Sequence, residues 1–182
     1  LLCDRGSSVI FASEEKSAGK TSMLSALIDF IPPNYQKSYV YGPKFESPEQ
    51  EEGLTKTYLL TPGISDTHES NLWKSDVAKM LKWSNDGGPF GTTMYAGSPE
   101  HVIRVFSTSP LKVPNKALSK IGVIVIVDAI STGGRSVSRR VRELALVVPE
   151  KSGKPKLITL VGWEPDLDQY NFMDSQLAIS NL

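Results

Sequence analysis

Short runs of apolar residues alternate along the chain with longer segments in which apolar positions recur at helical spacing. Val9–Ala12 is such a run, bounded by polar residues, and it predicts a buried strand. In the next segment, 21–31, apolar residues fall on one helical face, which predicts a helix. Pro32 and Pro33 end that helix, because proline lacks the amide donor and clashes with the preceding turn. The chain therefore opens with a strand followed by a helix.

The same alternation continues through the middle of the chain. Ser98-Pro99-Glu100 is typical of a helix start, since it offers a hydroxyl cap, a proline at the first helical position and a carboxylate at the positive end of the helix dipole. Further strands are predicted over 38–41, 57–60 and 92–96, and further helices around 73–81 and over 114–120.

The segment 122–128 is the most strand-like part of the sequence. Its β-branched residues run without alternation, which predicts that both faces are buried, as in the middle of a parallel sheet. Two later strands are predicted over 139–148 and 157–163, with a turn of Lys, Gly and Pro between them. Strands and helices that alternate and then give way to a strand pair indicate an α/β fold.

We therefore expect a single α/β domain over residues 1–182, with a mainly parallel sheet between helices and an antiparallel strand pair at about 139–163. The acidic, proline-bearing stretch at about 42–56 is predicted to be a solvated loop.

Composition narrows the function. Lys plus Arg and Asp plus Glu each number 20, so the net charge is zero, which argues against a nucleic-acid partner. One cysteine and two histidines leave too few ligands for a zinc site. The longest apolar stretch, inside 121–130, is shorter than a membrane span. The first residues lack an initiator Met and a long apolar segment, so we expect a piece of a longer cytoplasmic protein.

A phosphate-binding loop is predicted between the first strand and the first helix. Backbone N–H groups of such a loop surround a phosphate, its lysine reaches the outer oxygens, and its Thr hydroxyl ligates Mg²⁺. The predicted ligands are therefore ATP and Mg²⁺, with Lys20 and Thr21 in those two roles. Glu14 stands where the full pattern has its first glycine. The predicted nucleotide-binding residues are Ser17, Ala18, Gly19, Lys20, Thr21 and Ser22.

Several further motifs follow in a fixed order. Residues 92–98, Thr-Thr-Met-Tyr-Ala-Gly-Ser, lead into a helix and then into Pro110-Leu-Lys-Val-Pro114 and the strand at 122–127. The segments Arg139-Arg-Val-Arg-Glu-Leu144 and Trp163-Glu-Pro-Asp166 come later. With the phosphate loop, this order resembles the type II and type IV secretion and pilus motor ATPases, especially the archaeal branch that drives pili and archaella. The resemblance runs from about Val9 to Tyr170.

This resemblance implies a RecA-like fold and ATP hydrolysis coupled to filament assembly or protein export. It also implies a homo-hexameric ring in the full-length protein, and a peripheral location at the inner membrane through a platform protein.

The chain departs from the family at its catalytic motifs. Tyr95 stands where the family has histidine, and Gly63 and Ser65 stand where it has the water-polarising glutamate and an arginine. The remaining catalytic candidates are Asp66, at the end of that motif, and Glu46, in place of an acidic pair. Two functions therefore stay open: an active motor ATPase, and a catalytically degenerate relative that serves as a nucleotide-binding, structural or regulatory subunit.

Two features allow alternative interpretations. Asp128 follows four apolar strand residues and is a second candidate Mg²⁺ ligand, or else a solvated residue at a strand end. The basic cluster of Arg135, Arg139, Arg140 and Arg142 is expected to be a solvated strand edge, with a neighbouring subunit's nucleotide as the alternative partner.

Overall fold

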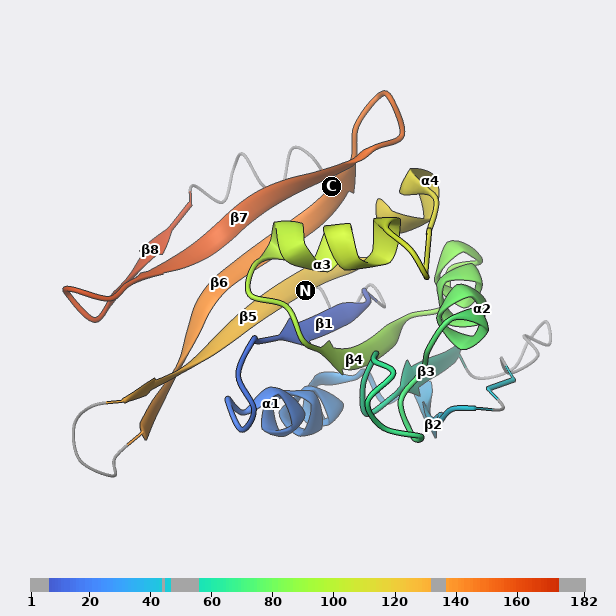
Figure 1. Cartoon of the computed structure of the whole chain (residues 1–182), viewed down its shortest axis with the longest axis horizontal. Helices are drawn as coiled ribbons and strands as arrows, with labels where there is room; N and C mark the ends of the chain where they lie inside the picture. Colours follow the sequence, from blue (N-terminus) through green and yellow to red (C-terminus); the bar gives the residue numbers. More distant parts are fainter. Residues whose placement is uncertain (1–6, 44, 47–55, 132–136, 174–182) are drawn as a thin grey trace.

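The computed structural model describes residues 7–43, 45–46, 56–131 and 137–173 (Figure 1). Within them the chain forms one mixed sheet with helices on both faces. The elements are β1 (Val9–Ala12), α1 (Lys20–Leu27), η1 (Ile28–Phe30), β2 (Tyr35–Tyr39), β3 (Lys56–Leu60), α2 (Ser75–Asn85), β4 (Phe90–Met94), α3 (Pro99–Ser107), α4 (Asn115–Leu118), β5 (Gly122–Ser131), β6 (Val137–Pro149), β7 (Pro155–Glu164) and β8 (Gln169–Phe172).

The strand order in the sheet is β2-β3-β4-β1-β5-β6-β7-β8. Strands β2, β3, β4, β1 and β5 pair in parallel, and β6, β7 and β8 extend the sheet as an antiparallel ribbon. This confirms the predicted parallel sheet with an antiparallel C-terminal addition. The expectation that the strand at 122–128 has parallel neighbours holds on one side only, because β5 pairs in parallel with β1 and antiparallel with β6.

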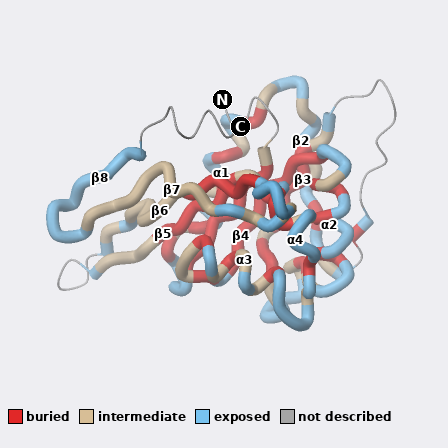
Figure 2. Tube along the Cα trace, turned by 90° about the horizontal axis from the view of Figure 1, so that it is seen from above, coloured by how far each residue is buried: buried red, intermediate tan, exposed pale blue. Residues whose placement is uncertain are grey.

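Strand β1 lies between β4 and β5 and is buried on both faces. Figure 2 shows buried residues gathered around β3, β4 and β5, and exposed residues along β8. Val9 and Phe11 pack on the face covered by α1, where Leu24 and Leu27 meet them. Ile10 and Ala12 pack on the opposite face, in the core to which α2, α3 and α4 contribute. Because successive strand residues point to opposite faces, four consecutive apolar residues fill both layers.

The helix starts follow from local sequence. Ser98 caps α3, since its Oγ accepts a 3.1 Å hydrogen bond from the His101 N–H and Pro99 takes the first helical position. This confirms the predicted start. The predicted helix over 21–31 is shorter in the structure: α1 ends at Leu27, and a tighter 3₁₀ turn, η1, leads toward the two prolines.

Other elements lie close to their predicted positions. The predicted strands over 38–41 and 92–96 lie a few residues earlier, as β2 and β4. The sequence pattern did not predict β8, an exposed edge strand. Within the predicted loop at 42–56, residues 42, 43, 45 and 46 lie outside helices and strands, and Lys56 already begins β3. Residues 44 and 47–55 fall outside the described residues.

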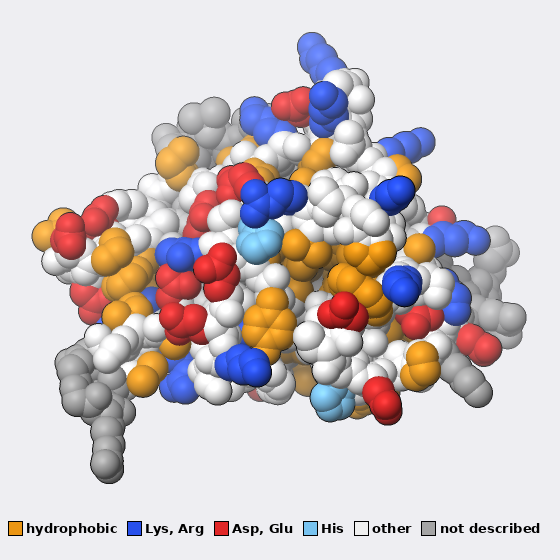
Figure 3. Space-filling view, viewed as in Figure 1, with side chains coloured by type: hydrophobic (Ala, Val, Ile, Leu, Met, Phe, Trp, Pro, Cys, Tyr) orange, Lys and Arg blue, Asp and Glu red, His pale blue; other side chains and the backbone are white. Residues whose placement is uncertain are grey.

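The surface carries both charge signs. On the face shown in Figure 3, basic and acidic side chains are interspersed, in line with the zero net charge. The longest helix in the described ranges, α2, has 11 residues, and none of the helices there combines the length and apolar character that crossing a bilayer requires.

Candidate functional site

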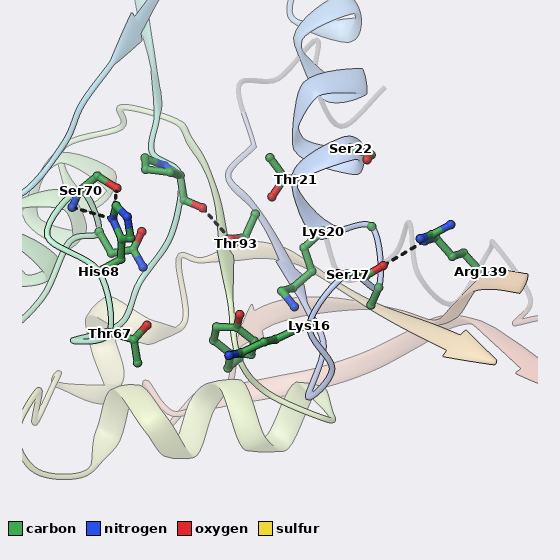
Figure 4. A pocket seen from close by; sticks show the side chains of 15 residues that line it. Lys16, Ser17, Lys20, Thr21, Ser22, Thr67, His68, Ser70, Thr93 and Arg139 are labelled. Atoms are coloured by element: carbon green, nitrogen blue, oxygen red, sulfur yellow. Dashed lines mark hydrogen bonds between the residues drawn. The ribbon is translucent and has the colours of Figure 1, made fainter. Parts of the chain in front are cut away.

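A cavity of about 780 Å³ opens at the carboxyl ends of β1 and β4, beside the start of α1 (Figure 4). The carboxyl ends of parallel strands share one edge of the sheet, which is where α/β folds bind ligands. The described residues that line the cavity are Lys16, Ser17, Ala18, Gly19, Lys20, Thr21, Ser22, Pro62, Thr67, His68, Ser70, Asn71, Thr93, Tyr95 and Arg139. All six predicted nucleotide-binding residues are among them.

The loop before α1 contains left-handed residues, as anion-binding turns do. Ser17 and Gly19 have φ angles of 61° and 100°, both in the left-handed region. The Met23 N–H donates a 2.9 Å hydrogen bond to the Gly19 carbonyl oxygen, which begins α1. Left-handed residues in such turns direct successive N–H groups toward one concavity, and the positive end of a helix adds to its pull on anions. The predicted turn at Gly19 and helix start at Lys20 are confirmed; their role in binding stays a prediction.

Lys20 is buried, with an exposed fraction of 8%, yet it contributes to the cavity wall. Its Nζ donates a 2.7 Å hydrogen bond to the Glu15 carbonyl oxygen and lies 4.3 Å from the centroid of the Tyr95 ring. Burial lowers the pKa of the Lys20 ammonium, and the negative charge of Glu15 opposes this shift. The Lys20 ammonium is thus partly desolvated, and its contacts are the Glu15 carbonyl oxygen and the Tyr95 ring. An anion in the cavity can take the place of these two contacts.

Arg139, from β6, reaches the outer side of the same loop (Figure 4). Its Nε donates a 3.1 Å hydrogen bond to the Ser17 carbonyl oxygen. A Cβ atom at Gly19 would lie 3.1 Å from the Arg139 Cδ, so the loop and the arginine are in close contact. Lys16, Lys20 and Arg139 bring three cationic side chains to the cavity, and none of its described lining residues is Asp or Glu.

The opposite wall comes from the segment after β3. Thr93 Oγ1 donates a 2.6 Å hydrogen bond to the Pro62 carbonyl oxygen, which joins this segment to β4. Farther along, the Asn71 amide donates to Ser65 Oγ at 2.7 Å, and His68 Nδ1 lies 2.8 Å from Ser70 Oγ. This wall is therefore built from hydroxyl, amide and imidazole groups.

Gly63, which the sequence resemblance matches to a water-polarising glutamate, is closely surrounded. A Cβ atom there would lie 3.1 Å from Asn71 Oδ1 and 3.3 Å from Thr93 Oγ1. A larger side chain there would therefore require these polar groups of the wall to give way slightly.

The catalytic candidates do not come together. Tyr95 lines the cavity and contacts Lys20. Asp66 is exposed and is absent from the described lining, although Thr67 next to it takes part. Glu46 is also exposed and lines a separate hollow with Phe45. The structure therefore brings one of the three candidates to the phosphate loop.

The two predicted Mg²⁺ ligands lie in different places. Thr21 lines the large cavity, whereas Asp128 lines a second hollow of about 320 Å³ and pairs with Arg142, Oδ2 to Nη1, at 3.1 Å. Mg²⁺ is usually held through carboxylates together with phosphate oxygens. The described lining of the large cavity offers hydroxyls without a carboxylate, and the described ranges hold no group of three or more His, Cys, Asp or Glu arranged to hold a metal. These residues do not fit a carboxylate-held Mg²⁺.

The predicted basic cluster separates into different contacts. Arg140 forms a two-pronged ion pair with Asp168, both bonds being 2.8 Å. Hydrogen bonds from Arg140 and from Trp163 lower the pKa of Asp168 to about 2. Arg142 pairs with Asp128, and Arg139 contacts the phosphate loop of its own chain. Arg135 falls outside the described residues.

Sequence reasoning missed two parts of the site. Arg139 stood out only as a member of a basic cluster, because 122 positions separate it from Ser17. The wall at 67–71 carried no motif. The feature that could have revealed this wall is the number of hydroxyl and amide residues in the segment that follows a buried strand, at the sheet edge where ligands bind.

Comparison with known proteins gives similarity in structure alone. No protein-family model matches the chain, and no curated protein matches it in sequence. The chain is similar to the VirB11 ATPase of the Brucella suis type IV secretion system in complex with sulphate, with a TM-score of 0.48, 16% identity and coverage of 76% of this chain and 49% of that one. It is also similar to the Legionella pneumophila ATPase DotB, with a TM-score of 0.44, 12% identity and coverage of 98% and 49%. The chain spans about half the length of each.

Proposed function

We propose that this chain is a RecA-like nucleotide-binding domain related to the motor ATPases of type II and type IV secretion and pilus systems, and that its cavity binds the phosphates of ATP. The observation that carries the proposal is the loop between β1 and α1, where Ser17 and Gly19 are left-handed and the buried Lys20 faces the cavity. The order of the sequence motifs supports the relationship, and its archaeal pilus and archaellum branch is the finer form of the proposal.

Phosphate binding follows from groups already in place. The loop N–H groups and the start of α1 attract an anion. Lys20 exchanges its contacts with the Glu15 carbonyl and the Tyr95 ring for phosphate oxygens, and such charge-assisted hydrogen bonds are stronger than neutral ones. With Lys16 and Arg139 on the same cavity, the charge of the site is matched to a polyphosphate.

Of the two functions left open by the sequence, the geometry favours the catalytically degenerate subunit over the active motor. Hydrolysis of a phosphoanhydride needs an oriented water and stabilisation of the charge that develops. Gly63 offers no carboxylate, its surroundings are filled by Asn71 and Thr93, and the described lining carries no Asp or Glu. We propose slow turnover or none, with binding of ATP as the retained property.

The wider setting belongs to the same proposal. The full-length protein would form a homo-hexamer in the cytoplasm and contact an inner-membrane platform protein, without a nucleic-acid partner. The mixed charges in Figure 3 support the last point.

Isothermal titration calorimetry of the chain with ATP tests the proposal. We expect binding by the unmodified chain and a loss of affinity of about tenfold or more in Lys20→Ala, since a hydrogen bond to a charged group contributes on the order of a tenfold factor or above. Lys37→Ala, an exposed lysine of β2 away from the cavity, is the matched control and keeps the original affinity. Equal affinities of the Lys20 variant and the unmodified chain would contradict the proposal.

A further inference from the structure

The cavity presents cations where a nucleotide site is expected to present a metal. In phosphoryl-transfer sites a divalent ion usually neutralises part of the triphosphate charge and is itself held by carboxylate groups. Here the described lining supplies Lys16, Lys20 and Arg139. The carboxylates close to the loop, Glu14, Glu15 and Asp128, line the second hollow instead. The Glu14 side chain packs on Gly97, and Asp128 is paired with Arg142.

Arg139 differs from the neighbouring arginines of β6. Within the described ranges, Arg140 and Arg142 are paired with carboxylates, Asp168 and Asp128 respectively, whereas Arg139 has no such pair. Its one hydrogen bond to a described residue uses Nε and the Ser17 carbonyl oxygen. The two Nη groups thus have no hydrogen-bond partner among the described residues, and a guanidinium presents them in a planar fork that matches two phosphate oxygens.

The position of Arg139 fixes which part of a ligand it meets. Nε is tied to Ser17 and Cδ lies against Gly19, so the guanidinium is held at the loop that surrounds the phosphates. Since a loop anchored in this way needs little reordering when an anion enters, the arginine can add its charge at a small entropic cost.

We propose, on the basis of the proposed function, that Arg139 acts within its own chain as a phosphate-binding residue and takes over the charge neutralisation that a metal provides elsewhere. Binding of a nucleoside triphosphate to this site is therefore independent of Mg²⁺. The ligand class is a polyphosphate, recognised through Lys20, Arg139 and the loop N–H groups.

Titration calorimetry with ATP in excess EDTA and in excess Mg²⁺ is the first test, and it needs no variant. We expect dissociation constants that agree within about threefold, less than the tenfold factor typical of one lost charged hydrogen bond. An affinity that rises tenfold or more with Mg²⁺ would overturn the inference and leave the proposed function intact. Failure to bind ATP under both conditions would reject the proposed function and the inference with it.

The second test separates a phosphate contact from mere support of the loop. Arg139→Gln, in EDTA, is expected to weaken ATP binding about tenfold or more, Arg139→Lys to restore most of that loss, and AMP binding to change by less than about threefold. Arg140→Gln, on the same strand but paired with Asp168, is the matched control and keeps the ATP affinity. Equal ATP affinities of the Arg139→Gln and Arg140→Gln variants, both folded at the temperature of the titration, would overturn the role of Arg139.

Discussion

The ammonium of Lys20 lies 4.3 Å from the centroid of the Tyr95 ring, so the cation at the start of α1 is stacked on an aromatic side chain that directly follows β4. Tyr95 stands where the resembled family has histidine. The Tyr95 ring thus gives Lys20 a partner inside the cavity, and we expect this partner to compete with any anion that enters.

Removing that partner is expected to strengthen phosphate binding. A cation–π contact at a partly exposed site contributes about 0.5–1 kcal/mol, so Tyr95→Ala should raise the affinity for inorganic tripolyphosphate about two- to fivefold. Tripolyphosphate is the probe because it has no base that could stack on the ring. Tyr95→Phe keeps the ring and should leave the affinity unchanged. An unchanged or lower affinity in Tyr95→Ala, measured by calorimetry, would show that the ring does not compete for the ammonium.

Ser17 holds a backbone conformation that favours glycine, with φ of 61°. The left-handed conformation costs a residue with a Cβ atom about 1–2 kcal/mol, and glycine costs about 0.4–1 kcal/mol in unfolded-chain entropy. Ser17→Gly should therefore raise the free energy of unfolding by roughly 0.5–1 kcal/mol. Urea unfolding followed by circular dichroism measures this change, and a less stable variant would mean that the Ser17 side chain stabilises the loop.

Gly19→Ala should be clearly destabilising, because the new methyl group meets both a left-handed backbone and the Arg139 Cδ at 3.1 Å. Gly153→Ala is the matched control: φ there is 78°, and nothing lies within 4 Å of the added atom. The control should lose about 1–2 kcal/mol from the backbone alone, and Gly19→Ala should lose more. Equal losses of unfolding free energy in the two variants would show that the Arg139 side chain moves away from the new methyl group at no energetic cost.

Gly63→Glu is not expected to create an ATPase. The added side chain would enter a space where Asn71 and Thr93 already lie within 3.3 Å of the new Cβ, and overpacking of this kind costs about 1–3 kcal/mol of stability. Gly162→Glu adds the same side chain where nothing lies within 4 Å and serves as the control for stability. Phosphate release measured for both variants should stay at background, and robust hydrolysis by Gly63→Glu would contradict this account of the wall.

The ion pair between Arg140 and Asp168 makes folding sensitive to acid. Because the pKa of Asp168 is lowered to about 2 in the folded state, its contribution to stability is present above the unfolded pKa of about 4 and is lost as the pH falls toward 2. Asp168→Asn should therefore be less stable than the unmodified chain near pH 6, and the two should converge near pH 2. Urea unfolding across this range measures the difference, and a constant gap would contradict the assignment.

Local patterns predicted the parts of the fold that depend on local forces. The apolar run at Val9–Ala12, the capping residues Ser98 and Pro99, and the left-handed Gly19 each specify their structure through neighbours in the sequence. The β-branched strand at 122–128 was also evident, although its antiparallel partner changed the expected surroundings.

Contacts between distant segments account for what the sequence could not predict. The bond from Arg139 to Ser17 depends on how β6 pairs with β5, and no local pattern encodes that register. Asp128 comes directly after an apolar run within β5, as a metal ligand would, but whether it faces a phosphate or an arginine depends on β6. The edge strand β8 is exposed throughout and has only four residues, so its alternation of polar and aromatic side chains was too short to reveal a strand.

The central place of β1 has a thermodynamic consequence for whatever ligand the loop binds. A strand that is buried on both faces and paired on both sides is among the last segments to open in local unfolding. The loop after Ala12 is thus tethered to the slowest-opening part of the molecule, and α1 closes its other end through the bond from Met23 to Gly19. Most of the conformational entropy of this turn is given up during folding rather than at binding, so an incoming anion meets a receptor that is already rigid.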